Sequence, residues 1–514
     1  MRVEDRRQFG LVLVLMLPIA FWSMAVKKTE VLTEPKWRAG LELIKHTHEK
    51  PILLASAIGG LVLAFLLIWG MNELSKSDFG GAAFKRFIRG TKTTSLSGLK
   101  RKTKEKNKEQ VTIAGIPMPT KVENLHLLVQ GATGSGKSVL MRELAYTSLK
   151  RRDRAIFLDP NGDMFSKFGG PKDIILNPYD DRTQGWTFFN EIRADYDFHR
   201  YALSLVPRGQ TADAEEWCAY GRLLLRETAR KLKMIGKPSV YELYHWTTIA
   251  EPDDLRKFLK GTTAESLFAG SSEASKALTS ARFVLSDKLP EHLNMPVGDF
   301  SIRTWLEEGE GNLYITWRED MAEALKPLIS AWIDAVFVSI LSMGEDENRR
   351  IWAFIDELAS LEKLSSLEAA LTKGRKHGLR VVAGLQSTSQ LDDIYGRELA
   401  QTLRSCFRSL AVLGGSKTDP RTGEDMSKAL GQHEVERDKY SKSSGARSTL
   451  STSEDIKAEQ VVTASEIASL PDLTGFIAFA GDFPVAKFLL KPLNFKKVNE
   501  PFIERGAECL ATRY

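Results

Sequence analysis

The chain has 514 residues, of which 43% are hydrophobic and 27% charged, a balance that excludes an intrinsically disordered protein and has room for several globular domains. Its formal net charge of +6 at pH 7 is small for this length, so charge alone neither demands nor excludes a polyanionic partner. The three cysteines, Cys218, Cys406 and Cys509, lie far apart. Their spacing excludes a disulfide framework and a structural zinc site, and it favours buried thiols in a reducing compartment.

Two uncharged apolar runs near the N-terminus, residues 9–26 and 51–71, are each long enough to cross a bilayer. The first run could instead be a signal peptide cleaved near Ala25, but Trp22 and Met24 make a poor cleavage site. We therefore expect two retained spans, in a membrane anchor that covers residues 1–75.

A basic linker is expected to follow the anchor, over residues 76–110, where lysine and arginine are frequent. The loop between the two spans is basic as well, which weakens the charge signal for topology. The richer linker nevertheless predicts that the large C-terminal part and the N-terminus both face the cytosol. Two interpretations of the linker are open: a solvated segment, or a segment that binds anionic lipid headgroups or nucleic acid.

A phosphate-binding motif begins at Gly131 and reads Gly-Ala-Thr-Gly-Ser-Gly-Lys-Ser, which matches G-x-x-x-x-G-K-[ST] at every position. An apolar run at residues 125–129 predicts a strand before the loop, and residues 139–144 continue as a helix. Backbone N–H groups of such a loop point at phosphate oxygens, and the helix N-terminus adds favourable positive charge. Lys137 is expected to reach the β- and γ-phosphates of ATP, and Ser138 to bind Mg²⁺. The predicted nucleotide contacts are Gly131, Ala132, Thr133, Gly134, Ser135, Gly136, Lys137, Ser138 and Val139.

An apolar strand at residues 350–355 ends in two carboxylates, Asp356 and Glu357. Ligands bind at the carboxyl ends of the strands in open parallel sheets, which predicts that this pair lies beside the P-loop. We expect Asp356 to hold the magnesium shell and Glu357 to activate the attacking water as a general base. Because a phosphotransferase has no need of the second carboxylate, the pair favours hydrolysis.

A further strand is predicted at residues 379–385 and is followed by Gln386, which is placed to sense the γ-phosphate. Arg375 lies on the turn before this strand and is the candidate arginine finger for a neighbouring subunit. Arg380, Arg404 and Arg408 are rival candidates, and an exposed arginine without any such role is the alternative.

The remaining pattern completes a doubly wound α/β sheet, with strands at 155–158, 173–176, 312–316 and 409–413 and a hairpin at 475–480 and 486–490. Residues 195–300 have helical periodicity and no strand pattern, which predicts an inserted all-α domain. The nucleotide-binding domain is then formed by residues 111–194 and 301–514. Residues 159–163, Asp-Pro-Asn-Gly-Asp, read as a turn that could lie near the nucleotide, and residues 440–453 as a polar loop.

Taken together, the spans, the segment GATGSGKS, the run WAFIDELASLEKL, the stretch GRKHGLRVVAGLQS and the DPNGD turn resemble the type IV secretion coupling proteins over essentially the whole chain. The resemblance implies a RecA-like P-loop domain, a homo-hexamer at the bacterial inner membrane and DNA-dependent ATPase activity. It also implies partners: single-stranded DNA carrying a relaxase, accessory DNA-processing proteins and the secretion channel. Lys137, Ser138, Asp356, Glu357 and Gln386 match the family's nucleotide motifs.

Two other interpretations remain open at this point. The chain could be a different ring-shaped DNA translocase, although such pumps usually carry more spans and a DNA-reading terminal domain. It could also be a docking adaptor that binds ATP only to hold an oligomer together, but Glu357 argues against a protein that never activates water. An ABC transporter is disfavoured, since no LSGGQ-like signature lies between the P-loop and Asp356.

Overall fold

The structure is a computed structural model that describes residues 3–29, 43–45, 47–73, 79, 84, 86–443 and 449–506. Cys509 lies outside these residues, whereas Cys218 and Cys406 are half-buried free thiols. The chain divides into two compact units, residues 1–89 with 434–458 and residues 90–433 with 459–514.

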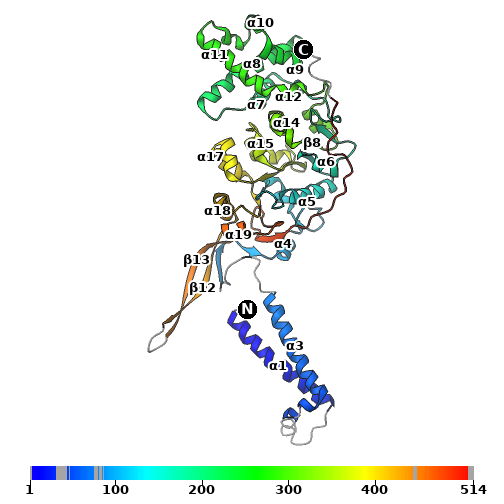
Figure 1. Ribbon diagram of the computed structural model, residues 1–514, viewed down its shortest axis with the longest axis vertical. Helices are drawn as coiled ribbons and strands as arrows, with labels where there is room; N and C mark the ends of the chain where they lie inside the picture. The colour runs from blue at the N-terminus through cyan, green and yellow to red at the C-terminus, as the bar shows by residue number, and fades with distance from the viewer. Residues whose placement is uncertain are drawn as a thin grey trace. The chain divides into compact units, whose positions relative to one another are not determined.

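The first unit contains the two apolar helices, α1 (Val3–Thr29) and α3 (Pro51–Glu73), which pack side by side (Figure 1). The Trp22 indole donates a hydrogen bond of 3.0 Å to Thr47 Oγ1 in the short helix η1 (Thr47–Glu49) before α3. Both helices are long and apolar enough to span a membrane, and most of their side chains are not covered by protein. The expected pair of membrane spans stays a prediction, since it rests on length and apolar composition.

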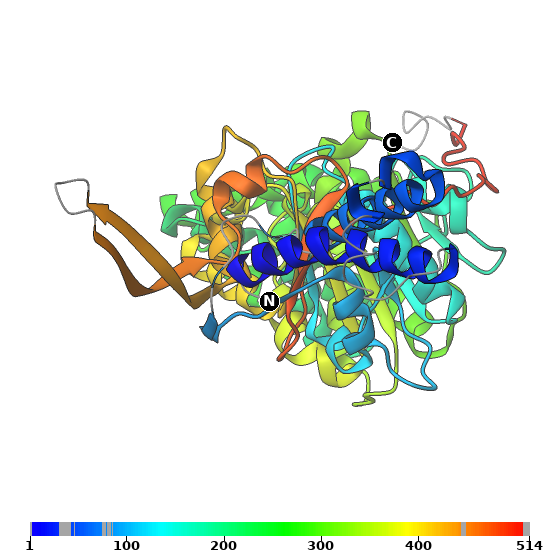
Figure 2. The same cartoon turned by 90° about the horizontal axis from the view of Figure 1, so that it is seen from below.

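A three-stranded sheet in the order β1-β12-β13 is formed by β1 (Arg86–Gly90), β12 (Gln432–Ser443) and β13 (Thr449–Gln460). The last two strands run as a long ribbon (Figure 2). The expectation of a polar loop over residues 440–453 is therefore wrong outside 444–448, which lie beyond the described residues. The run of Ser, Thr and charged residues has no apolar alternation, so it carries no strand signal, yet backbone pairing in a ribbon requires no buried face.

The second unit is built on a ten-stranded sheet in the order β2-β15-β14-β11-β5-β10-β9-β6-β8-β7. All neighbouring pairs are parallel except those of β14, which is antiparallel to β11 and to β15. The strands are β2 (Thr93–Thr94), β5 (Leu127–Gln130), β6 (Arg154–Pro160), β7 (Ile174–Leu176), β8 (Leu313–Trp317), β9 (Ile351–Ile355), β10 (Leu379–Leu385), β11 (Ser409–Leu413), β14 (Thr474–Ala478) and β15 (Val485–Leu489).

Helices cover both faces of this sheet, as expected for a doubly wound fold. In chain order they are α4 (Leu96–Thr103), α5 (Lys137–Lys150), α6 (Asp163–Phe168), α7 (Asp195–Leu205), α8 (Ala212–Met234), α9 (Val240–Tyr244), α10 (Pro252–Phe258), α11 (Ser272–Lys288), α12 (Pro290–Leu293), α13 (Ile302–Glu308), α14 (Ala322–Ser342), α15 (Leu367–Lys373), α16 (Thr388–Tyr395), α17 (Arg397–Cys406), α18 (Pro420–Leu430) and α19 (Ala464–Ala468). A small hairpin, β3 (Thr112–Ile113) with β4 (Ile116–Pro117), lies between α4 and β5 in the chain.

Alternate side chains of the central strands enter two separate cores. Phe354 of β9 packs in the core that contains α5 and α6, whereas Ala353 and Ile355 pack in the core that contains α14, α15 and α17. Because both faces are buried, β5, β9 and β10 are apolar throughout, which is why the sequence predicted them correctly. The apolar helix α14 also has the length of a membrane span, but 72% of it is buried, so it is a core helix.

Residues 195–299 contain only helices and turns, and α7 to α12 gather at one end of the second unit (Figure 1). They share one hydrophobic cluster with the sheet face that α14 covers. A separate all-α domain therefore stays a prediction, as do the other expected boundaries. Two of the expected assignments differ from the structure. Residues 434–458, expected in the nucleotide-binding domain, fall in the same unit as the N-terminal helices. Part of the expected linker is folded, because α4 buries Leu99.

Candidate functional site

The P-loop connects β5 to α5 through residues 131–136. Gly136 has φ +115°, a conformation that side chains rarely adopt, and it leads directly into the helix at Lys137. The Lys137 Nζ donates a hydrogen bond of 2.8 Å to the Gly131 carbonyl, so the ammonium lies within the curve of the loop. Burial lowers the pKa of Lys137, while the carboxylates of Glu357 and Asp356 oppose that change.

Asp356 follows β9 directly and lies against the first turn of α5. The Ser138 hydroxyl lies 3.2 and 3.0 Å from the two Asp356 oxygens and donates to that carboxylate, although 218 positions separate the residues. Burial raises the pKa of Asp356, and the Ser138 hydrogen bond and the Lys137 charge act against the rise. One hydroxyl and one carboxylate are hard oxygen ligands of the kind that Mg²⁺ takes alongside phosphates and water.

Both carboxylate oxygens of the next residue, Glu357, are shielded from solvent, and the Gln386 side chain and the Ala359 backbone approach it as donors without full hydrogen-bond geometry. Burial raises its pKa, whereas the nearby Lys137 charge lowers it. A shielded carboxylate whose neighbours do not saturate its oxygens is available to accept a proton from water.

Gln386 completes the group from the end of β10. Its Oε1 accepts a hydrogen bond of 2.9 Å from Thr133 Oγ1 in the P-loop. Gly384 lets the end of β10 lie close to the end of β9, because a Cβ at position 384 would lie 1.8 Å from the Asp356 carbonyl oxygen. Gly384 is a residue that sequence reasoning missed, since only the packing of β10 on β9 reveals its role.

These groups surround one hollow of about 310 Å³. It is lined by Ala132, Thr133, Gly134, Gly136, Lys137, Ser138, Val139, Asp356, Glu357 and Gln386. Of the expected nucleotide contacts, Gly131 and Ser135 do not line it. Ser135 instead donates to the Ala132 carbonyl at 2.7 Å and holds the loop in shape.

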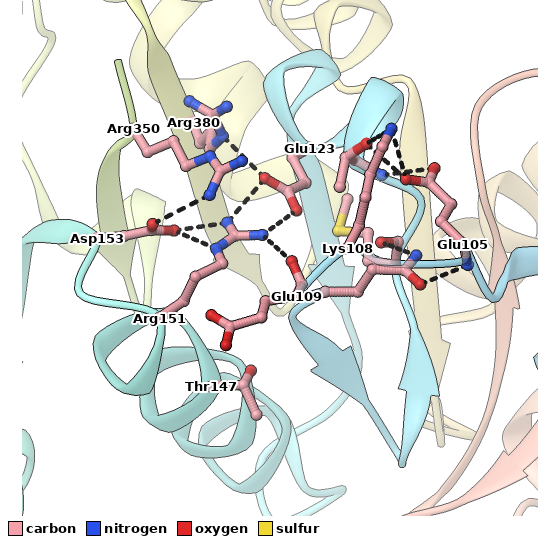
Figure 3. A network of polar contacts seen from close by, with 12 residues as sticks. Glu105, Lys108, Glu109, Glu123, Thr147, Arg151, Asp153, Arg350 and Arg380 are labelled. Atoms are coloured by element: carbon pink, nitrogen blue, oxygen red, sulfur yellow. Dashed lines mark hydrogen bonds and ion pairs between the residues drawn. The ribbon is translucent and has the colours of Figure 1, made fainter. Parts of the chain in front are cut away.

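The arginines that the sequence singled out do not reach this hollow within the chain. Arg375 is exposed in η8 (Gly374–His377), before β10, whereas Gln386 follows that strand. Arg380 is buried and donates to Glu123 at 3.1 Å (Figure 3), so it is not free to act as a finger. Arg404 pairs with Asp392 at 3.0 Å.

The Asp-Pro-Asn-Gly-Asp turn supports the site from one side. Asp159 is buried and accepts hydrogen bonds from the backbone of Met164 and Phe165, which caps α6. Burial raises its pKa to about 7. Asp163 pairs with Arg142 at 3.3 Å, and Arg142 in turn donates to the Ser138 carbonyl at 3.2 Å. The sequence left the role of this turn open. In this geometry the turn contacts α5, the helix that carries Ser138, and holds it in place.

Several known proteins that are similar to this chain in sequence or structure are proteins of conjugation systems. Residues 110–491 match the family described as the type IV secretion-system coupling protein DNA-binding domain. The coupling protein TraD of Escherichia coli (strain K12) is 31% identical over 419 residues, which are 78% of this chain and 57% of TraD. The conjugal transfer protein TraG of Rhizobium radiobacter is 25% identical over 198 residues, or 38% of this chain and 31% of TraG. This chain thus spans less than two thirds of either relative.

Solved structures of the coupling protein TrwB are more similar. The unbound monoclinic form of TrwBdeltaN70 is 67% identical with a TM-score of 0.80, covering 83% of this chain and 99% of that chain. TrwB in complex with ADP and Mg²⁺ is 66% identical with a TM-score of 0.79, covering 84% and 100%. The complex with the non-hydrolysable ATP analogue ADPNP has the same identity, score and coverage.

Proposed function

We propose a function on the premise that this chain belongs to the type IV secretion-system coupling protein family. The protein is a membrane-anchored ATPase that links a relaxase–DNA complex to a secretion channel and drives or licenses DNA export by ATP hydrolysis. The carrying observation is the Ser138–Asp356 contact with the solvent-shielded Glu357 carboxylate beside it, at one hollow next to Lys137.

In this proposal the chain's own groups divide the work of hydrolysis. Lys137 binds the β- and γ-phosphates of ATP, and Ser138 and Asp356 hold Mg²⁺, whose charge neutralises the phosphates when it is bound. The complexes of TrwB with ADP and Mg²⁺ and with ADPNP support this assignment. Glu357 accepts a proton from the attacking water. Gln386, which is hydrogen-bonded to Thr133, senses whether the γ-phosphate is present.

The site and the helices together suggest a place in the cell. We assign α1 and α3 as two spans of the bacterial inner membrane, with the second unit in the cytosol where ATP is present. The partners proposed are single-stranded DNA, the relaxase with its accessory proteins, and the channel. The family's description as a DNA-binding domain supports the first of these.

The proposal is tested by phosphate release from the full chain in detergent, with and without a single-stranded oligonucleotide. We expect a severalfold rise in rate with DNA. The Lys137→Ala variant, which removes the ammonium from the loop, should release phosphate in neither condition. ATP binding that depends on Lys137, without hydrolysis in either condition, would instead favour the docking adaptor.

A homo-hexamer with Arg375 acting across the subunit interface is part of the same proposal. Arg375 is exposed and lies away from its own chain's hollow, as a residue that serves a neighbour must. Mixing inactive Arg375→Ala chains with inactive Lys137→Ala chains should restore part of the ATP turnover, because some interfaces then combine an intact loop with an intact arginine. Mixed chains as inactive as either variant would remove this role, and Lys376→Ala serves as the exposed neighbouring control.

A further inference from the structure

A second, larger hollow of about 760 Å³ lies in the same unit, on the sheet face behind the P-loop. Its floor is formed by β5, β11 and the β14–β15 turn, and its walls by α17 and α18. It shares no lining residue with the hollow at Lys137. Its volume is in the range of small-molecule sites, about 300–1,000 Å³.

The lining carries an excess of positive charge. Three arginines, Arg404, Arg408 and Arg421, face a single carboxylate, Asp425. Arg404 and Arg421 also donate to opposite oxygens of Asp392, which compensates part of their charge. The Arg408 guanidinium makes no hydrogen bond or ion pair with any residue that the structure describes, so one cation at this hollow stays uncompensated.

A polar group in the floor also lacks a partner. Gln130 is 3% exposed, and its Nε2 is buried without a hydrogen-bond acceptor among the described residues. An unsatisfied buried amide is unfavourable, and a ligand oxygen that accepts its hydrogen bond would relieve this cost. Phe407, which is 8% exposed, and Phe483, whose ring also lies beneath Lys121, add apolar ring surface to the lining.

We propose that this hollow binds a free nucleoside phosphate and that its occupancy alters ATP turnover. The hollow offers arginines for the phosphate, an amide and aromatic rings for the base, and a nucleotide-sized volume. These features suit a nucleoside phosphate better than they suit a simple anion. The inference goes beyond the proposed function, because it adds a second, regulatory nucleotide to the one held by the P-loop.

The position of the hollow supplies the coupling. Gln130 immediately precedes Gly131 of the P-loop, and Thr388 lies two residues after Gln386. Arg404 Nη1 donates to the Thr388 carbonyl at 3.5 Å, and Thr388 Oγ1 donates to Asp425 at 3.0 Å. A ligand that bonds Gln130 and draws Arg404 toward itself therefore acts on two segments of the hydrolytic site, and its effect on nucleotide affinity at the P-loop is reciprocal.

The test is equilibrium dialysis of radiolabelled ADP with the full chain in detergent. Wild type should bind two ADP per chain, and Lys137→Ala should keep one. Adding Arg408→Ala to Lys137→Ala should weaken the remaining binding roughly tenfold or more, as the loss of a charged hydrogen bond does. The exposed control Arg256→Ala, on α10, should leave it unchanged. Arg408→Ala alone should change ATP turnover and Arg256→Ala should not; unaltered turnover in Arg408→Ala would overturn the regulatory part of the proposal.

Three further outcomes would overturn the proposal. These are no residual ADP binding in Lys137→Ala, residual binding that Arg408→Ala and Gln130→Leu both leave intact, or binding there of a single-stranded oligonucleotide but not of ADP. The last result would assign the hollow to DNA. Failure of the proposed ATPase site is seen separately, as ADP binding in wild type that does not depend on Lys137.

Discussion

Replacement of Glu357 by glutamine should lower ATP turnover by about 10²–10⁴-fold, the contribution typical of a positioned general base, while ATP binding stays near the wild-type level. Glutamine fills the same volume but cannot accept the proton from water. Binding is preserved because Lys137, Ser138 and Asp356 keep their contacts. The measurements are phosphate release and equilibrium nucleotide binding on the same preparation.

Two controls sharpen this experiment. Glu368→Gln changes an exposed carboxylate on α15 and should leave turnover unchanged. Burial raises the pKa of Glu357, so turnover should fall as the pH drops through that raised pKa, sooner than an exposed glutamate would require. A Glu357→Gln variant that keeps more than about a tenth of the wild-type rate would exclude Glu357 as the base.

Glu123→Gln should destabilise the second unit by about 3–5 kcal/mol, because it leaves buried arginines without their counter-charge. Glu123 accepts hydrogen bonds from Arg151 at 2.7 and 2.9 Å and from Arg380 at 3.1 Å (Figure 3). The side chains of all three are at most 5% exposed. Arginine does not lose its proton in proteins, so the network cannot relax by neutralisation.

The remaining acid of the network cannot replace Glu123. Asp153 accepts from Arg151 Nε at 3.0 Å and from the Trp352 indole at 2.8 Å, and after the substitution it alone would face two buried cations. Chemical unfolding of the full chain, followed by protease sensitivity, measures the change. Glu310→Gln is the matched control, since its pair with Lys172 is exposed and should hardly matter. Equal shifts in both variants would show that the buried network adds nothing to stability.

Much of the fold and of the candidate site was predictable from local pattern. The central strands were found because burial on both faces makes β9 and β10 apolar throughout. The P-loop was found because its glycine and lysine spacing reflects local backbone geometry at Gly136, with φ +115°. Asp356 and Glu357 were found because a carboxylate pair at the end of a buried strand is conspicuous. Each of these signals lies within a few residues of chain.

What the sequence by itself determined is thus the identity of the strands, the phosphate loop and the acidic pair, together with two apolar helices near the N-terminus. Only the tertiary structure decided which distant residues come together. Ser138 contacts Asp356 across 218 positions, Glu123 contacts Arg380 across 257, and Gln130 lines the same hollow as Arg404 and Arg421. The reason is physical. Local sequence sets backbone conformation and which side chains avoid water, whereas contacts between distant segments depend on the spatial order of the strands in the sheet.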